Sequence, residues 1–311
     1  MSASPQHVPV SKAQAWYRAT RPRVFTASYV PMGVAATAAL QDGVFHLGFF
    51  ILSLLGVMLL QTAANLVNEY YDFVRGSDDL KVAGQGMAIK NYGLTPREVG
   101  IGALLALVGG GLIGLYLLSQ SGPALWWIGI GGALVAVTYT AGPFPLAYNG
   151  LGEIAAGIFM GPMVVVGAYY VMAKSIPAYL WWVSLPIALM VAAILHANNL
   201  RDLEADRAAN KRTLAVLFGR DIARIEYKIL VFGAYISLLA LVILQVAPVT
   251  TLVALLTLPE ALRLTHIFDT ETDAQKLHPA QGRTAKLHGQ FGLFMVLGWL
   301  AWVGLQLVIG G

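Results

Sequence analysis

The chain has 311 residues and a formal net charge of +4, and 57% of its residues are hydrophobic while only 12% are charged. Because about one-quarter of a typical soluble domain is charged, this composition indicates an integral membrane protein. The absence of cysteine excludes cysteine catalysis, disulfide bonds and thiolate metal sites.

Nine apolar stretches predict transmembrane helices, because a helix needs about 20 mostly apolar residues to cross a bilayer. In chain order they are 24–41, 46–73, 98–119, 124–141, 150–172, 178–199, 227–247, 249–267 and 287–309. We therefore expect an all-α membrane protein that forms a single polytopic domain over residues 1–311. Residues 1–22 would form a cytoplasmic or interfacial segment, and residues 74–97 and 200–226 would form cytoplasmic loops that cap the bundle.

The distribution of basic residues predicts how these helices are oriented. All lysines and arginines except Lys174 fall on one side of the predicted bundle. Since cytoplasmic loops carry an excess of Lys and Arg, this side is expected to face the cytoplasm. The N-terminus would then be inside and, with an odd number of spans, the C-terminus outside. The positive net charge follows from this topology and needs no nucleic-acid partner.

The second apolar stretch ends in an acid-rich segment. Asn65, Asn68 and Asp72 are spaced by three and four residues and therefore share one helix face. Gly76 can end the helix, which would let Asp78 turn back toward that face. Carboxylates at this depth are costly unless they bind something cationic, so they are candidates for a functional site.

A turn-rich stretch from Tyr139 to Glu153 joins the fourth and fifth predicted helices. Pro143, Pro145 and several glycines predict a tight re-entry into the membrane. Glu153 lies inside the start of the fifth helix, where a carboxyl group needs a polar partner or a cavity. The stretch could also be only a structural turn with a buried carboxyl.

The sixth apolar stretch ends in a second acid-rich segment. Asn198, Asp202 and Asp206 step by four residues along one helix face, with His196 and Asn199 beside it. Ordinary solvated helix ends are the alternative for either segment alone. Two segments with matched Asn and Asp spacing on the same side of the membrane favour a shared functional site.

Together, the two acidic segments predict a site for a hard divalent cation. Their carboxylate and amide oxygens suit Mg²⁺, which is often held by one or two carboxylates plus substrate phosphates, so an anionic substrate such as a diphosphate is expected. No cluster of histidine or cysteine has the spacing of a zinc site. Three acids lie off the shared faces and are expected to be solvated or outside the ligand shell, namely Glu69, Asp79 and Glu204.

Basic residues lie in or after each acidic segment. They are Lys81, Lys90, Arg201, Lys211 and Arg212. Cations next to a diphosphate would stabilise the charge that builds up on this leaving group. Since inner loops are basic in any case, each of these residues could instead serve topology alone.

These motifs resemble those of a known family. The acidic segments resemble the Asn-x-x-x-Asp-x-x-x-x-x-Asp and Asp-x-x-x-Asp motifs of the UbiA superfamily of intramembrane aromatic prenyltransferases. Within it, the chain looks most like the 1,4-dihydroxy-2-naphthoate polyprenyltransferases of menaquinone synthesis, the MenA branch. The matching segments are Asn68–Asp78, Tyr139–Glu153 with Gly161-Pro162 and Tyr169-Tyr170 after it, and Asn198–Arg207 with Lys211–Leu214 after it.

The resemblance implies a ring of about nine helices around a central cavity that opens sideways to lipid. It also implies two Mg²⁺ ions, one held by Asn68, Asp72 and Asp78 and the other by Asn198 or Asn199, Asp202 and Asp206. The ions would grip the diphosphate of a polyprenyl donor, and Lys211, Arg212 and Tyr139 would contact it. One departure is Met87, because relatives often carry an arginine near this position; Lys90 or Lys81 could take its place.

The implied reaction is Mg²⁺-dependent transfer of a polyprenyl group to 1,4-dihydroxy-2-naphthoate in the cytoplasmic membrane of a prokaryote. It would give demethylmenaquinol and release diphosphate and CO₂. Asn68, Asp72, Asp202 and Asp206 would be the catalytic residues, and Glu153 or an aspartate could assist deprotonation of the acceptor.

Two alternatives remain open at this stage. The first is the same chemistry with another acceptor, such as homogentisate, 4-hydroxybenzoate or a lipid headgroup. The second is a cation-coupled transporter, which would predict inverted repeats and broken helices near the bilayer midplane. Here the acids lie near one membrane face and no inverted repeat is evident, so the sequence favours the enzyme.

Overall fold

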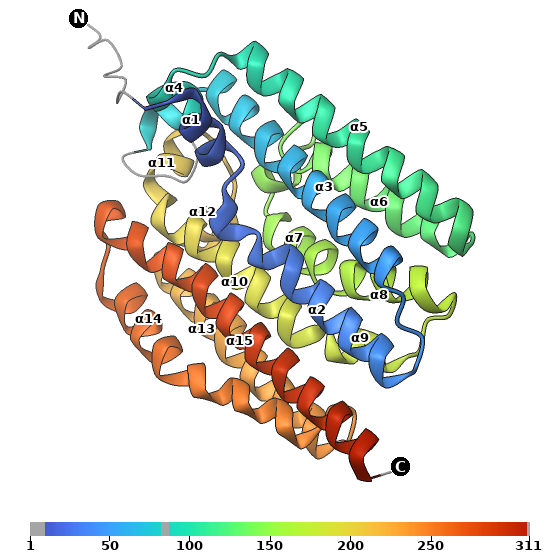
Figure 1. Ribbon diagram of the computed structural model, residues 1–311. Coiled ribbons are helices and arrows are strands. Elements are labelled where there is room, and N and C mark those ends of the chain that lie inside the picture. Colours follow the sequence, from blue (N-terminus) through green and yellow to red (C-terminus); the bar gives the residue numbers. More distant parts are fainter. Residues whose placement is uncertain (1–9, 82–86, 310–311) are drawn as a thin grey trace, which may run out of the picture.

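The computed structural model describes residues 10–81 and 87–309, and helices make up nearly all of this part of the chain. Within the described residues no β-strand forms, and a single isolated bridge joins Asn149 to Arg212. Figure 1 shows the long helices running side by side in one bundle. The prediction of an all-α membrane protein is therefore confirmed.

Helices occupy all nine stretches that were predicted to cross the membrane. They are α2 (Thr26–Gln41), α3 (Leu47–Val74), α5 (Pro96–Ser121), α6 (Ala124–Thr138), α7 (Gly152–Met160) with α8 (Pro162–Ala173), α9 (Tyr179–Val183) with α10 (Leu185–Arg201), α13 (Arg220–Ile243), the 3₁₀ helix η4 (Val249–Thr257) with α14 (Leu258–Thr270), and α15 (Ala274–Ile309). Among the described residues, seven of these segments are long and apolar enough to span a bilayer. The other two, α2 and α6, have only 16 and 15 residues, so a count of nine spans is not confirmed.

Two predicted helix starts were wrong. Helix α13 begins at Arg220 instead of residue 227, and α15 begins at Ala274 instead of residue 287. The prediction followed the apolar residues alone, whereas a helix can continue past its apolar stretch through turns that carry polar side chains. Arg283, in the polar first turns of α15, forms an ion pair of 2.7 Å with Glu260 of α14, for example.

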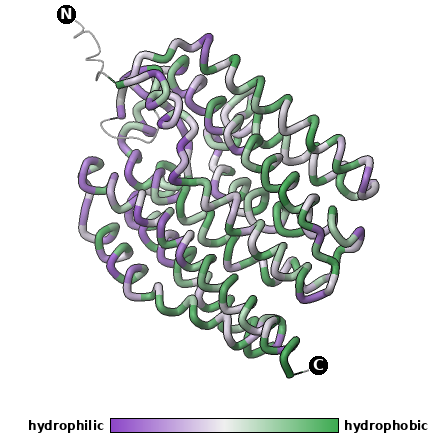
Figure 2. Tube along the Cα trace, in the orientation of Figure 1, coloured by the Kyte–Doolittle hydropathy of each residue, from purple (hydrophilic) through white to green (hydrophobic). Residues whose placement is uncertain are grey.

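Short helices connect the long ones. They are α1 (Lys12–Ala19), α4 (Ala88–Tyr92), α11 (Leu203–Ala208), α12 (Leu214–Phe218) and the 3₁₀ turns η1 (Pro22–Val24), η2 (Ser77–Leu80) and η3 (Leu146–Tyr148). Helices α1, α4 and α11 gather at one end of the bundle (Figure 1). Figure 2 shows that hydrophilic residues are concentrated at this end, whereas the body of the bundle is mainly hydrophobic. The two acidic segments therefore lie together at this hydrophilic end of the bundle, which is called the acidic cap below.

Helix α10 is the most deeply buried part of the bundle. In its span, Tyr179–Arg201, 67% of the most apolar stretch is buried against protein, compared with 22% for both α3 and α5. It packs against α7, α13 and α15. The second acidic segment therefore starts from the core, while α3 and α5 pair with each other to form an outer wall.

Candidate active site

The first acidic segment folds back on itself at the end of α3. Gly76 has a left-handed backbone conformation with φ +70°, which suits glycine and ends the helix. The next turn brings Asp78 toward Asp72, so that Lys81 Nζ lies 3.0 Å from a carboxylate oxygen of each. Asn68 Nδ2 donates to Asp72 Oδ2 at 3.3 Å. The predicted return of Asp78 toward this helix face is therefore confirmed.

The second acidic segment continues almost as one helix from α10 into α11. The backbone amide of Asp202 donates to Asn198 O at 2.9 Å, and that of Asp206 donates to Asp202 O at 2.8 Å. The three side chains thus share one face, as their spacing predicted. Arg201 holds the Asp202 carboxylate with two hydrogen bonds of 2.7 and 2.6 Å, a fork that fixes its orientation. Lys211 Nζ lies 3.5 Å from Asp206 Oδ1.

The stretch between α6 and α7 joins the two acidic segments. Tyr148 of η3 donates its hydroxyl hydrogen to Asp72 Oδ1 at 2.7 Å. Its carbonyl oxygen accepts from the Arg212 amide at 3.1 Å, and Lys211 Nζ lies 5.3 Å from the centre of its ring. Tyr148 therefore contacts both sides of the site. The sequence prediction did not single it out, although it lies inside the Tyr139–Glu153 stretch.

Burial and mutual charges shift the proton affinities of the groups in the cap. Burial raises the pKa of Asp206 to about 6, although the nearby Lys211 opposes this change. Burial alone would lower the pKa of Lys211, but Asp206 and Asp72 outweigh it and raise the pKa. Burial, and then the charge of Asp72, raise the pKa of Tyr148 to about 12. At neutral pH the site therefore holds ionised lysines beside carboxylates.

Several buried oxygens in this cap have no hydrogen-bond partner among the described residues. They are Asn198 Oδ1 and both carboxylate oxygens of Asp206. Buried polar atoms are normally hydrogen-bonded, so oxygens without a hydrogen bond that are grouped with other carboxylates fit a site for a hard cation.

A cavity of about 530 Å³ extends from the acidic cap into the membrane part of the bundle. Its polar end is lined by Asn68, Asp72, Lys81, Asn198, Asp202 and Lys211. Tyr139, Asn199 and Arg201 also line the cavity. The remaining wall is mainly apolar and is formed by α3, α5, α6, α8 and α10. The cavity can therefore hold a ligand that has an anionic head and a hydrophobic body.

Residues 29–288 match the model of the UbiA prenyltransferase family. The chain belongs to this family. It is 33% identical to the 1,4-dihydroxy-2-naphthoate octaprenyltransferase of Bacillus subtilis, over 93% of each chain. It is 29% identical to the enzyme of the same name from Escherichia coli, over 93% of this chain and 96% of that one. A UbiA prenyltransferase domain-containing protein 1 homolog from Drosophila melanogaster is 34% identical over 92% of this chain and 79% of its own length.

Solved structures of UbiA homologs have the same fold. A homolog from Archaeoglobus fulgidus, solved with DMAPP and Mg²⁺ bound, superposes with a TM-score of 0.62 at 17% identity, over 90% of this chain and 98% of that one. The apo structure of a homolog from Aeropyrum pernix gives a TM-score of 0.68 at 16% identity, over 89% and 97%. The chain is therefore a prenyltransferase with the UbiA fold.

Glu69 was expected to be either solvated or outside the ligand shell, and the structure rules out the first alternative. Its side chain is fully buried and accepts hydrogen bonds from the backbone amides of Met87 at 2.8 Å and Ile89 at 3.2 Å. Arg21 Nη2 lies 3.5 Å away. Glu69 is four residues after Asn65 and three before Asp72, so the spacing could have placed it near their face. It joins the α4 segment to α3.

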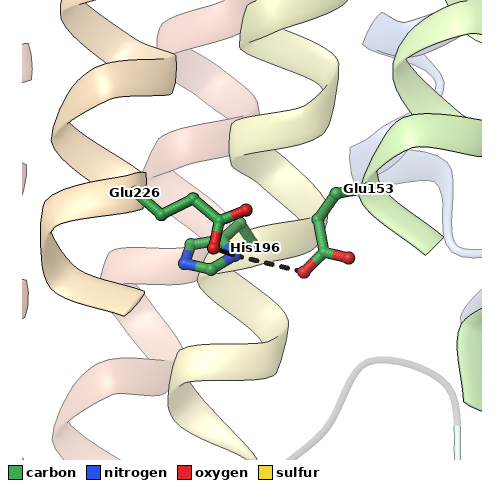
Figure 3. Close-up of side chains that lie close together, drawn as sticks. All are labelled: Glu153, His196 and Glu226. Atoms are coloured by element: carbon green, nitrogen blue, oxygen red, sulfur yellow. Dashed lines mark hydrogen bonds and ion pairs between the residues drawn. The ribbon is translucent and has the colours of Figure 1, made fainter. Parts of the chain in front are cut away.

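Glu153 has the polar partners that its position required. His196 Nδ1 lies 3.1 Å from Glu153 Oε1, and Asn199 Nδ2 donates to the same oxygen at 2.6 Å. Glu226 Oε2 lies 3.7 Å from His196 Nδ1, and Figure 3 shows that the three side chains come from three different helices. A trio of two carboxylates and a histidine has the ligand types of a metal site, which the sequence spacing did not indicate.

The remaining predicted residues lie in different places around the cap. Lys90 Nζ donates to the backbone oxygen of Asp78. Arg212 is exposed and does not line the described cavity, so its contact with a diphosphate stays a prediction. Glu204 is exposed as expected, with 67% of its side chain accessible. The side chain of Asp79 lies outside the described residues.

Proposed function

We propose that this prenyltransferase moves a polyprenyl group from polyprenyl diphosphate to 1,4-dihydroxy-2-naphthoate, giving demethylmenaquinol, diphosphate and CO₂. The observation that carries the proposal is the junction of two acidic segments and two buried lysines at the polar end of an apolar cavity. The names of the relatives from Bacillus subtilis and Escherichia coli support the acceptor.

The donor diphosphate would lie at the polar end of the cavity. Lys81, Lys211 and Arg201 line this end and would stabilise the charge on the oxygen that leaves C1 of the donor. The hydroxyl of Tyr139 is a further donor for a diphosphate oxygen. The apolar wall excludes water, which would otherwise compete with the acceptor for C1.

The residues also fit two Mg²⁺ ions, which would neutralise diphosphate charge when bound. One ion would be held by Asn68, Asp72 and Asp78, and the other by Asn198 or Asn199, Asp202 and Asp206. The oxygens of Asn198 and Asp206 that have no hydrogen-bond partner among the described residues support this assignment.

The acceptor ring would enter the cavity beside C1 of the donor. The C1–O bond breaks and diphosphate keeps its electron pair, while an electron-rich ring carbon forms the new bond to C1. Loss of CO₂ and a proton then restores the aromatic ring. Glu153 directly follows Gly152, which lines the cavity, and either Glu153 or an aspartate of the site is the candidate for assisting proton loss.

Transfer by the purified protein in lipid nanodiscs tests the proposal. Farnesyl diphosphate and Mg²⁺ are supplied with dihydroxynaphthoate, or with homogentisate or 4-hydroxybenzoate in parallel. Asp72→Ala and Asp202→Ala are expected to lower transfer at least 100-fold, in the range seen when one essential charge-stabilising group is lost. Glu204→Ala is the matched control, because Glu204 is an exposed acid of the second segment.

Each outcome decides a different part of the proposal. A prenylnaphthoquinol formed only with Mg²⁺ and lost in both Asp variants supports it. Product from another acceptor alone would keep the site and change the substrate. Full activity of Asp72→Ala or Asp202→Ala would overturn the assignment of the site.

A further inference from the structure

A buried histidine lies between two carboxylates where three helices meet. His196 of α10 is fully buried, and its Nδ1 lies 3.1 Å from Glu153 Oε1 of α7 and 3.7 Å from Glu226 Oε2 of α13 (Figure 3). One ligand atom of each residue lies within 4.8 Å of those of the other two. None of the three belongs to the residues proposed above to hold Mg²⁺, so this trio needs an explanation of its own.

The second ring nitrogen of His196 determines what the first one can do. Nε2 lies 2.7 Å from the backbone oxygen of Ala223, and since a carbonyl oxygen can only accept, Nε2 carries a hydrogen. In a neutral imidazole, Nδ1 then has a lone pair that faces two carboxylates. This arrangement requires a cation at its centre, either a second proton on the ring or a metal ion. Histidines that bind metals commonly donate their other N–H to a backbone carbonyl, as His196 does.

The charges around the trio favour a dication over a proton. The carboxylates of Glu153 and Glu226 carry two negative charges, whereas a protonated His196 supplies only one positive charge. Within the part of the chain that the structure describes, no lysine or arginine forms an ion pair with either glutamate. Asn199 contributes one neutral hydrogen bond to Glu153 Oε1. Buried charges are normally paired or coordinate metals, and a dication would balance both carboxylates.

The ligand types and their spacing indicate which ions fit. An imidazole with two carboxylates suits Zn²⁺ or Mn²⁺, whereas Mg²⁺ prefers oxygen ligands. Around Zn²⁺, bonds of about 2.1 Å place neighbouring ligand atoms about 3.0–3.4 Å apart, so the trio would need to close only slightly around an ion. The side chain of Glu226 is 24% accessible, which gives an ion a route into the trio. Three protein ligands leave a further position for water.

We propose that Glu153, His196 and Glu226 form a third metal site, which takes a transition-metal dication of the Zn²⁺ or Mn²⁺ class and joins α7, α10 and α13. The name three-helix site is used below for these residues. The site also positions Asn199, because Glu153 holds the amide nitrogen of Asn199 and leaves its oxygen for the acidic cap. With Glu153 bound to a metal, an aspartate of the cap is the group left to assist proton loss from the acceptor.

Zn²⁺ binding to the purified protein tests the three-helix site. Because the acidic cap also offers carboxylates, the titrations use a background variant that carries both Asp72→Ala and Asp202→Ala. The protein is stripped with EDTA and titrated by calorimetry with Zn²⁺ in an excess of Mg²⁺, and its metal content is measured after washing. In this background Glu226→Gln removes one ligand at nearly constant shape. Glu204→Gln is the matched control, because 67% of the Glu204 side chain is accessible.

The background variant and its Glu204→Gln derivative are expected to bind one Zn²⁺ ion each at this site. Glu226→Gln should weaken this binding at least about 100-fold, since losing even an outer-shell partner costs roughly 10–100-fold. Zn²⁺ should also raise the thermal midpoint of the first two proteins and not that of the third, which separates lost binding from misfolding.

Two results would overturn the three-helix site. One is a background variant that binds no Zn²⁺, and the other is equal Zn²⁺ affinity in the Glu226→Gln and Glu204→Gln derivatives. Either result would leave His196 as a protonated bridge between two glutamates. The titrations contain no donor and no acceptor, so failure of the proposed prenyl transfer would not change what they show about the metal.

Discussion

At the scale of single residues, Asp206 is completely buried, and its carboxylate oxygens accept no hydrogen bond from the described residues, although Lys211 Nζ lies 3.5 Å from one of them. Burial raises its pKa to about 6, so below this pH the folded protein without bound metal holds a proton that Mg²⁺ must displace. The apparent affinity for Mg²⁺ is therefore expected to fall about tenfold per pH unit below pH 6 and to level off above it. Calorimetric titrations between pH 5 and pH 8 measure this dependence.

The raised pKa of Asp206 also makes the stability of the folded protein depend on pH, and this dependence runs opposite to that of the Mg²⁺ affinity. Because the folded pKa of Asp206 lies above that of an unfolded aspartate, its contribution to stability is present below about pH 4 and is lost as the pH rises through about 6. Asp206→Asn should flatten both profiles, whereas Glu204→Gln should leave them unchanged. A wild-type Mg²⁺ affinity that stays constant from pH 5 to pH 8 would contradict the assignment of Asp206.

Glu69 is a buried carboxylate with a structural role at the edge of the site. Glu69→Ala would leave the amides of Met87 and Ile89 without their acceptor and remove a charged partner of Arg21. The expected cost is about 2–4 kcal/mol of unfolding free energy, measured by denaturant unfolding in detergent. Glu204→Ala removes an exposed acid and should cost much less. Equal losses in the two variants would show that the contacts of Glu69 add nothing.

At the scale of elements, the turn at Gly76 determines where Asp78 lies. Alanine at this left-handed position should cost about 1 kcal/mol. Gly43, in the connection between α2 and α3, has φ +68° and open space around it, so Gly43→Ala should cause similar strain away from the site. Only Gly76→Ala is expected to weaken Mg²⁺ binding as well. Unfolding curves and Mg²⁺ titrations of both variants separate strain from misplacement of Asp78.

Local rules explain why some elements of the site were predictable. The shared faces of Asn68 with Asp72 and of Asn198, Asp202 and Asp206 follow from helix spacing alone, and a glycine after an apolar helix indicates where it ends. The contact between Tyr148 and Asp72 joins residues 76 positions apart, so only tertiary packing brings it about. The same is true of the His196 and Glu226 pair, which comes from two different helices.

At the scale of the whole molecule, the nine helical stretches were predictable because membrane helices must satisfy their backbone hydrogen bonds within themselves. The number of membrane spans was not predictable, since α2 and α6 are too short to be assigned as spans by length alone. The cavity was expected only from the family resemblance, because its shape depends on how the helices pack. Four glycines that line the cavity show this limit, because they are visible in the sequence but the empty space beside them is not; they are Gly111, Gly114, Gly129 and Gly132.

The distribution of basic residues over the whole chain predicts how the bundle is oriented in the membrane. This prediction is easy to test, because the sequence has no cysteine. Single cysteines at Lys174, Arg97 and Lys276 would report on exposed positions at the two ends of the bundle. In intact bacterial cells, a membrane-impermeant maleimide is expected to label Lys174→Cys only. After the membrane is permeabilised, all three variants should react, which shows that each site is accessible. Labelling of Arg97→Cys or Lys276→Cys in intact cells would place the acidic cap outside, where a diphosphate donor made in the cytoplasm could not reach it.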